Sequence, residues 1–300
     1  MAVAIGRVNS RELRRLGLVP LLPLWAAGIY VAWYAVSWYS ARGLIGMDAH
    51  AYWLTAHDHQ LYGAPPMTLN AFLYSPAFAL LISPIAQLPW LIFAVLWITA
   101  EVVAFAWLLA PWGWRWAVPL LLLCTVETAL GNIYAWLALA AVLGMTRPGV
   151  WCFPLLTKIT PGIGIFWFAA RGERRHLGTA LGVTLIIAAI SFAIAPQSWI
   201  EWIHFIFTTP RSPALLLPYR IAGGVLVAIV AARTNRPRLL ALAMFLASPV
   251  IAINSLTILA AVPRLLEAQT WLRPPQVGMG WLLKLMPVRA GRSVGGGRWA

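Results

Sequence analysis

The chain is dominated by long apolar runs that are separated by short polar or basic connections. Because a helix that spans a bilayer needs roughly 20 apolar residues, we count about nine spans. Their approximate ranges are 18–39, 72–89, 90–110, 114–130, 131–146, 149–170, 177–195, 215–232 and 239–262. The pattern therefore predicts an all-α fold, a polytopic transmembrane helical bundle.

The predicted span 72–89 has the weakest signal, because Pro76, Pro84 and Pro89 interrupt it. Proline is tolerated in a membrane segment where neighbouring groups or a cavity satisfy the freed carbonyls. We expect this segment to cross the membrane, and a bent or re-entrant path is the alternative.

Composition supports the membrane class. Hydrophobic residues make up 61% of the chain, charged residues only 10%, and the mean hydropathy is +0.79, which excludes an ordinary soluble domain. The net charge of +14 comes from short arginine clusters between apolar runs, a pattern typical of cytoplasmic loops rather than of nucleic-acid binding. Cys124 and Cys152 both lie in apolar runs and indicate neither a disulfide nor a metal site.

The arginine clusters predict the orientation of the chain. Arginines between Arg7 and Arg15 place the N-terminus in the cytoplasm, and nine spans put the clusters 171–175 and 233–238 on the same side. Loops 40–71 and 196–214 then lie outside. The C-terminal tail disagrees, because nine spans would export its basic residues, which are Arg264, Arg273, Lys284, Arg289, Arg292 and Arg298. Either one span is miscounted, or the chain turns back near residues 281–286.

Three parts of the chain follow from this pattern. Residues 1–17 are expected to form a cytoplasmic N-terminal segment and residues 18–265 the membrane domain. Residues 266–300 are expected to form a basic tail, which is partly disordered because its end is rich in glycine.

Lys158 stands in the middle of the apolar run 151–168. A charged side chain near the bilayer centre costs at least ~2.5 to 3.5 kcal/mol on insertion scales, so such residues usually face a cavity or a partner. We expect Lys158 to bind an anionic, lipid-linked substrate. The alternative is an internal ion pair with Glu101 or Glu127.

The first outer loop holds both aspartates of the chain, Asp48 and Asp58, and three of its five histidines. If a helix begins near Gly46, Tyr52 lies on the same face as Asp48, four residues earlier. A carboxylate at an apolar boundary has a raised pKa, which suits a general base. Capping of the helix by Asp48 is the structural alternative. A metal site is a further alternative, with the ligands Asp48, His50, His57, Asp58 and His59.

Several segments together resemble a known family. They read GMDAHAYW from 46, LYGAPP from 61, FLYSPAFALLISPIAQLP from 72, GNIYAWL from 131, PLLTKITPGIGIFWFAARGERRHL from 154, SWIEWIHFIF from 198, LPYRIAGGVL from 217 and ASPVIAINSLTILAAVPRL from 247. In this order they resemble glycosyltransferase family 87, membrane enzymes of the GT-C class related to polyprenol-phosphate-mannose-dependent mannosyltransferases. Asn254 departs from the family pattern, in which a histidine or an aromatic residue is frequent, and this leaves the acceptor open.

The resemblance implies an inverting hexosyltransferase whose active site faces the outside of the bacterial cytoplasmic membrane. Its donor would be a polyprenyl-phosphate sugar, with mannose as the commonest, and its acceptor a glycolipid or glycan. The catalytic aspartate of the first outer loop corresponds to Asp48. We expect no cofactor, no metal and no nucleic-acid partner; the partners are the two substrates and membrane lipid. The substrate-binding residues that we expect are His50, Tyr52, Tyr74, Lys158, Arg220 and His204.

Arg220 would lie roughly 7 to 8 Å inside its span, at about 1.5 Å per residue. That depth suits a lipid phosphate, which a guanidinium binds bidentately, and a simple interfacial role is the alternative. Asn132 is expected to cap a helix at the cytoplasmic end, away from the donor. Trp199, Trp202 and His204 predict a membrane-parallel lid helix.

Two other function classes remain open. A transporter or flippase of lipid-linked sugars would use the same cations without needing Asp48 as a base, although the chain shows no internal repeat of the kind that builds many transporters. A membrane scaffold would have no shared cavity between Asp48 and Lys158.

Overall fold

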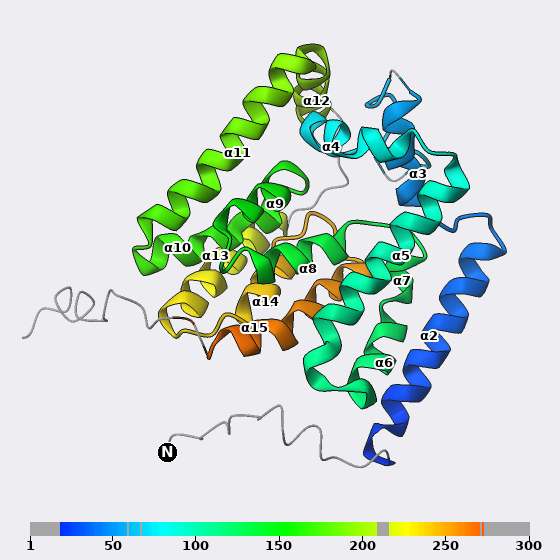
Figure 1. The fold of residues 1–300 in the computed structure, drawn as a ribbon, viewed down its shortest axis with the longest axis vertical. Coiled ribbons are helices and arrows are strands. Elements are labelled where there is room, and N and C mark those ends of the chain that lie inside the picture. The colour runs from blue at the N-terminus through cyan, green and yellow to red at the C-terminus, as the bar shows by residue number, and fades with distance from the viewer. Residues whose placement is uncertain (1–18, 59, 67, 209–215, 271, 273–300) are drawn as a thin grey trace, which may run out of the picture.

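The computed structural model describes residues 19–58, 60–66, 68–208, 216–270 and 272. Every regular element in these ranges is a helix (Figure 1), which confirms the all-α prediction for this part of the chain. The predicted N-terminal segment 1–17, His59 and the tail beyond residue 272 lie outside the described residues.

In the described ranges, four helices are long and ten are shorter. The long ones are α2 (Leu22–Ser40), α5 (Trp90–Leu109), α11 (Arg174–Ile194) and α13 (Leu217–Arg233). The shorter ones are α3 (Met47–Trp53), α4 (Pro76–Ala86), α6 (Trp114–Leu123), α7 (Thr125–Thr128), α8 (Tyr134–Leu143), α9 (Cys152–Leu156), α10 (Phe166–Arg171), α12 (Pro196–Thr208), α14 (Leu239–Leu246) and α15 (Val262–Ala268). Short 3₁₀ turns join them: η1 (Val19–Leu21), η2 (Leu54–Ala56), η3 (Ala110–Trp112), η4 (Pro148–Trp151), η5 (Thr160–Ile165) and η6 (Ile253–Ala261).

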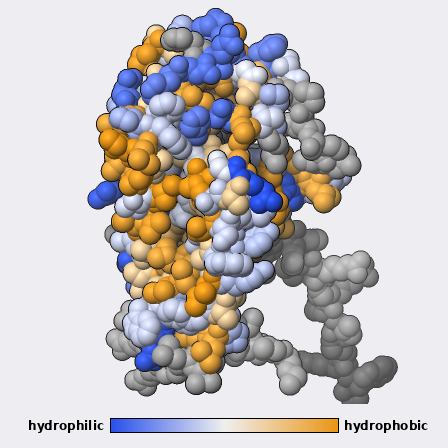
Figure 2. All heavy atoms as spheres, turned by 90° about the vertical axis from the view of Figure 1, so that its right-hand side faces the viewer, coloured by the Kyte–Doolittle hydropathy of each residue, from blue (hydrophilic) through white to orange (hydrophobic). Residues whose placement is uncertain are grey.

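Two helical segments in the described ranges, Trp90–Trp112 and Arg174–Ile194, are long and apolar enough to cross a membrane. Helices α4 and α8 are apolar but shorter. The predicted spans 114–130, 149–170 and 239–262 are each divided between shorter helices, so the count of nine stays a prediction. Figure 2 shows one face of the molecule, on which apolar residues dominate the middle and hydrophilic residues gather at the upper end.

Helix α4 starts and ends beside α3. Before its start, the Tyr74 hydroxyl lies 3.0 Å from the Tyr52 hydroxyl of α3. After its end, the Leu88 carbonyl accepts a 2.8 Å hydrogen bond from the indole of Trp53. Since Tyr52 and Trp53 are adjacent in a helix of seven residues, both ends of α4 lie at the same end of the molecule. Segment 72–89 therefore leaves and returns to the same end of the molecule, which favours the re-entrant alternative.

The segments behind α4 consequently run in the opposite direction from the prediction. Helices α6 and α7 return the chain to α3, where the backbone N–H of Asp48 donates to the Leu130 carbonyl at 2.9 Å. The prediction that Gly131 and Asn132 lie at the end away from Asp48 is therefore wrong. Because segment 72–89 was counted as a crossing, every later segment was predicted to start at the wrong end of the molecule.

The end of the molecule opposite to α3 gathers the starts of α2 and α6 and the end of α5. The Trp25 indole donates to the Arg115 carbonyl at 3.1 Å, and the Arg264 guanidinium donates to the Trp107 carbonyl at 2.9 Å. Arg264, the first basic residue of the tail region, thus shares an end with the start of α2. This placement favours a miscounted span over a turn near residues 281–286 as the origin of the conflict over the tail.

The two inner arginine clusters also meet each other. Arg171, at the end of α10, is buried and donates to the side chain of Asn235 at 3.0 Å, just beyond the end of α13. In Figure 1, α11 runs from the turn after α10 up to α12, so this turn lies at the end of α11 away from α12. Segments 171–175 and 233–238 therefore share one end of the structure, as the orientation rule predicted.

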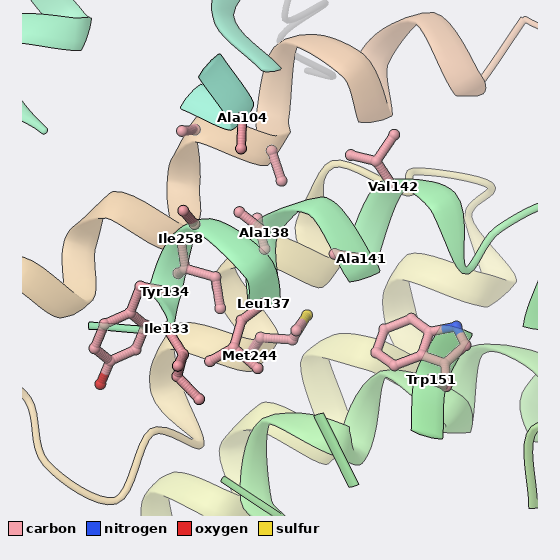
Figure 3. Close-up of a cluster of buried hydrophobic side chains, with 14 of the residues drawn as sticks. Ala104, Ile133, Tyr134, Leu137, Ala138, Ala141, Val142, Trp151, Met244 and Ile258 are labelled. Atoms are coloured by element: carbon pink, nitrogen blue, oxygen red, sulfur yellow. The ribbon is translucent and has the colours of Figure 1, made fainter. Parts of the chain in front are cut away.

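Helix α8 forms the centre of the hydrophobic core (Figure 3). Its alanines Ala135, Ala138 and Ala141 are fully buried, which lets α14 and η6 approach closely. Trp151 is also fully buried, and a methyl group added at Gly164 would lie 2.0 Å from its ring. This close packing holds η5, which begins two residues after Lys158, against Trp151 at the end of η4.

The path of α4 can be tested by labelling single cysteines from the two sides of a membrane. In a chain with Cys124 and Cys152 replaced by alanine, we expect Thr68→Cys and Trp114→Cys to react from opposite sides. Both positions are exposed, one beyond α3 and one at the start of α6. Labelling of both cysteines from the same side would contradict the re-entrant path and restore the crossing.

Candidate active site

Helix α3 presents Asp48 beside the turn that follows α7. Gly46 precedes the helix in the left-handed region (φ 75°), and the helix start has no side-chain cap. Asp48 therefore does not cap α3, contrary to the structural alternative. Gly131 approaches α3 so closely that a methyl group there would lie 2.6 Å from the Ala49 methyl group, and its φ of +68° disfavours other residues.

Asn132 joins the two charged residues that the sequence singled out. Its Nδ2 donates to Asp48 Oδ2 at 2.5 Å, while its Oδ1 accepts from Lys158 Nζ at 3.0 Å. The same Oδ1 accepts from the Ile133 backbone N–H at 2.7 Å, which fixes the amide in one orientation. A carboxylate and an ammonium thus share one amide, and the sequence reasoning missed it because it placed Asn132 at the wrong end.

Lys158 sits at a break in the helical path. Helix α9 ends at Leu156, and Ile159 takes the rare φ of +34°, so the chain turns sharply on both sides of the lysine. The ammonium lies 3.5 Å from the ring centroid of Tyr134, a cation–π contact. The alternative ion pair with Glu101 or Glu127 is not formed, since the described ion pairs all involve Glu173 or Glu267.

Glu127 holds in place the two residues behind Lys158, which are Tyr134 and Asn254. Its carboxylate is fully buried, accepts from the Tyr134 backbone N–H at 2.7 Å and accepts from Asn254 Nδ2 at 2.9 Å. Asn254, the residue that departs from the family pattern, therefore ties η6 to the start of α8. These bonds hold the Tyr134 ring on which Lys158 lies.

Arg220, on α13, is connected to Tyr134 through the loop between α14 and η6. One guanidinium nitrogen donates to the Pro249 carbonyl at 3.0 Å, and the Tyr134 hydroxyl donates to the next carbonyl, that of Val250, at 3.4 Å. The loop between α14 and η6 thus connects Arg220 with the ring under Lys158. The buried Nε of Arg220 has no hydrogen-bond partner among the described residues.

Two of the expected substrate-binding residues lie beneath Asp48 rather than in an open site. Tyr52 and Tyr74 are buried, and their hydroxyls form the 3.0 Å contact described above. Their rings pack on Phe78, and Tyr52 also packs on Trp97, whose indole donates to the Gly131 carbonyl at 2.8 Å. They support α3 and the turn that carries Asn132.

The two expected histidines lie apart from the hydrogen-bond network of Asp48, Asn132 and Lys158. His50 shares a 2.7 Å hydrogen bond with Asn70 and meets Trp90 edge-on. His204 lies on α12, 3.4 Å from the Thr208 hydroxyl. Neither has a hydrogen bond to Asp48, Asn132 or Lys158 in the described part of the chain.

The metal alternative has no support in the described ranges. There, no three His, Cys, Asp or Glu side chains lie close enough to hold a metal ion. His57 stacks on Trp53, and Asp58 accepts a 2.8 Å hydrogen bond from the Gln60 backbone. These residues follow the local turn and do not converge.

The surroundings of Asp48 favour a basic carboxylate. Burial raises the pKa of its carboxyl above the ordinary value, while the hydrogen bond from Asn132 and the positive charge of Lys158 offset part of the rise. Oδ2 is engaged by Asn132, and Oδ1 has no hydrogen-bond partner among the described residues. The group is therefore arranged to accept a proton at Oδ1, close to the ammonium of Lys158, which can hold an anion.

The shared amide should appear as an energetic coupling between its partners. We expect Asn132→Leu and Lys158→Met to be non-additive in the free energy of unfolding, with a coupling of about 1 to 3 kcal/mol. The reason is that either change alone leaves a polar group without its partner. Unfolding of the four variants in detergent measures this. Strict additivity would contradict the bond between the two side chains.

The comparisons with known proteins give one result. No curated protein and no solved structure matches the chain. The model of glycosyltransferase family 87 matches residues 72–277, a range that contains Asn132, Lys158 and Arg220 and begins after Asp48. Since this range is more than half of the 300 residues and follows the resemblance seen in the sequence, the chain belongs to glycosyltransferase family 87.

Proposed function

We propose that the protein is an integral-membrane glycosyltransferase that moves a sugar from a polyprenyl-phosphate donor to a glycolipid or glycan acceptor. The observation that carries the proposal is the amide of Asn132, which binds Asp48 on one side and Lys158 on the other. A base and an anion-binding cation at this spacing suit a transfer in which one oxygen attacks while a phosphate leaves. Mannose, the commonest donor sugar in the family, is the donor sugar that we propose.

The transfer would be a single inverting displacement. An acceptor hydroxyl oxygen forms a bond to the anomeric carbon as the bond from that carbon to the phosphate oxygen breaks. Asp48 Oδ1 takes the proton of the hydroxyl, and the electron pair of the broken bond leaves with the polyprenyl phosphate. Asn132 holds Asp48 in position by its bond to Oδ2.

The leaving phosphate needs positive charge, because little water is present there to stabilise it. Lys158 supplies a mobile ammonium beside Asp48, and Arg220 supplies a guanidinium across the loop of Pro249. Charge–charge attraction is much stronger in a poorly hydrated site than in water, so two cations can stabilise the leaving group substantially.

We also propose that the site faces the outside of the cytoplasmic membrane. Among the described residues, Arg115 and Arg264 lie at the end opposite to α3, and Arg171 meets the cluster 233–238 at the far end of α13 from Arg220. Basic flanks mark the cytoplasmic side, which leaves the end with Asp48 outside. A lipid-linked donor would reach it from the outer leaflet.

The two rival classes differ in what they need from Asp48. A scaffold would require no relation between Asp48 and Lys158, whereas both bind the same amide here. A transporter or flippase of lipid-linked sugars would use Lys158 and Arg220 to hold the phosphate but would form no new glycosidic bond. The decisive test is therefore chemical transfer.

Replacing Asp48 with asparagine should abolish sugar transfer. We expect Asp48→Asn to lower kcat by about 10²- to 10⁴-fold, the usual contribution of a general base, because the amide cannot accept the proton. The measurement is the transfer of labelled mannose from polyprenyl-phosphate-mannose in membranes that contain the protein.

Asp58→Asn is the matched control, since Asp58 is the other aspartate of the same loop and only accepts a backbone hydrogen bond. It should transfer at the wild-type rate. Undiminished transfer by a folded Asp48→Asn variant would exclude Asp48 as the base. Binding of the donor without any transfer by the wild type would favour the transporter.

Lys158 should also set the pH dependence of the reaction. Asp48 must be ionised to act, so kcat/KM rises with pH through the pKa of its carboxyl. The charge of Lys158 lowers that pKa. Lys158→Gln should therefore raise it and move the acidic limb of the kcat/KM profile to higher pH, whereas Lys158→Arg should leave the limb nearer to its wild-type position. An acidic limb that stays in place or moves to lower pH in Lys158→Gln would contradict this coupling.

A further inference from the structure

A cavity lies between α12 and the loop that follows η2. Its volume is about 600 Å³, within the usual range of small-ligand sites. The residues that line it are Gln60, Tyr62, Gly63, Gln197, Ile200, Glu201, His204, Phe205 and Thr208. None of them belongs to the network of Asp48, Asn132 and Lys158.

One wall of this cavity is aromatic and fixed in place. The rings of Tyr62 and Phe205 have centroids 5.8 Å apart and are tilted by 40°. The Tyr62 hydroxyl donates to the Tyr74 carbonyl at 3.0 Å, so its ring cannot turn away. Burial first, and the Glu201 carboxylate second, raise the pKa of Tyr62, which keeps this hydroxyl protonated as a donor.

The remaining walls carry hydrogen-bonding groups of several kinds. Gln197 Nε2 donates to Glu201 Oε1 at 3.1 Å, and the imidazole of His204 lies 3.4 Å from the Thr208 hydroxyl. Gln60 adds a second amide from the opposite side. Amides, an imidazole, a hydroxyl and a carboxylate beside aromatic faces can bind the hydroxyls and the apolar C–H faces of a sugar ring.

Tyrosine contacts connect the cavity to α3, the helix that carries Asp48. Tyr62 binds the backbone of Tyr74, and the hydroxyl of Tyr74 contacts that of Tyr52, one helical turn after Asp48. On the other side, the Trp202 indole donates to the Leu73 carbonyl at 3.4 Å and holds α12 over the same loop. A chain of sugars bound here would therefore have a fixed position relative to Asp48.

We propose that this cavity is the subsite for the part of the acceptor glycan behind the reacting sugar, and that it takes a neutral oligosaccharide. This rests on the proposed glycosyltransferase function and names its acceptor class. The preference for neutral sugars follows from Glu201, the one acidic side chain among the residues that line the cavity. Its carboxylate repels a phosphorylated or uronic-acid chain. The α12 helix then acts as one wall of a glycan site, in place of a plain lid.

The proposal is tested by binding of tetrasaccharides to the full chain in lipid nanodiscs. Saturation-transfer NMR with neutral mannotetraose and maltotetraose should detect binding of at least one of them. His204→Ala and Gln60→Ala should each weaken it about tenfold, as expected for the loss of one or two hydrogen bonds to a ligand. Ile203→Ala is the matched control, because Ile203 is exposed on the same helix and does not line the cavity.

The charge preference provides an independent readout. Acidic tetragalacturonate should bind more weakly than the neutral chains to the wild type, and Glu201→Gln should reduce that difference. Absence of binding by both neutral chains would overturn the proposal. So would equal effects of His204→Ala and Ile203→Ala, or a wild-type preference for the acidic chain.

Transfer assays separate this inference from the proposed function. With a long acceptor, His204→Ala should raise the acceptor KM about tenfold and leave kcat and the donor KM nearly unchanged, whereas a monosaccharide acceptor should show no difference. Normal transfer by His204→Ala with an unchanged KM for the long acceptor would contradict the subsite and leave the proposed function standing. Tetrasaccharide binding that depends on His204, in a protein that transfers no sugar, would sink the enzymatic proposal and leave the subsite standing.

Discussion

The amide of Asn132 is the interaction on which the rest of the site depends. A carboxylate and an ammonium that are both partly removed from water are stable only if each has a partner. Here one amide serves both, because its Nδ2 faces Asp48 and its Oδ1 faces Lys158. The distance between base and cation is thus set by the size of one side chain. A direct salt bridge would bring the two charges closer together than the amide allows.

The sequence predicted the chemical groups better than it predicted their arrangement. Lys158 and Asp48 stood out because a charge in or beside an apolar run is costly and must have a reason. The role of Asn132 was missed, since an asparagine after a glycine is an ordinary start of a helix. Only the position of the turn 129–132 against α3 distinguishes the two readings, and that position depends on the path of every segment between them.

The path itself could not be derived from hydropathy. Segment 72–89 is apolar throughout, and its three prolines allow a crossing as well as a re-entrant turn. The contacts that decide are tertiary: Tyr74 and Leu88 both meet α3. If one crossing is removed from the count, the predicted side of every later segment changes, and Arg264 then lies on the same side as the start of α2. The position of Arg264 therefore carries information on the number of crossings that the length of an apolar segment does not.

The network of Asp48, Asn132 and Lys158 and the cavity at α12 are built from different residues. Glu127 fixes Tyr134 and Asn254 behind Lys158, so the cation is positioned by groups that do not line the cavity. The cavity at α12 is built from a different helix and loop, and it is linked to α3 through the contacts of Tyr62, Tyr74 and Tyr52, beside the bond from Trp202 to the Leu73 carbonyl. A substitution in the cavity can therefore leave the bonds of Asn132 to Asp48 and Lys158 unchanged. For the proposed transfer, this separation lets the bound glycan vary while the proposed base stays in place, as preorganised catalysis requires.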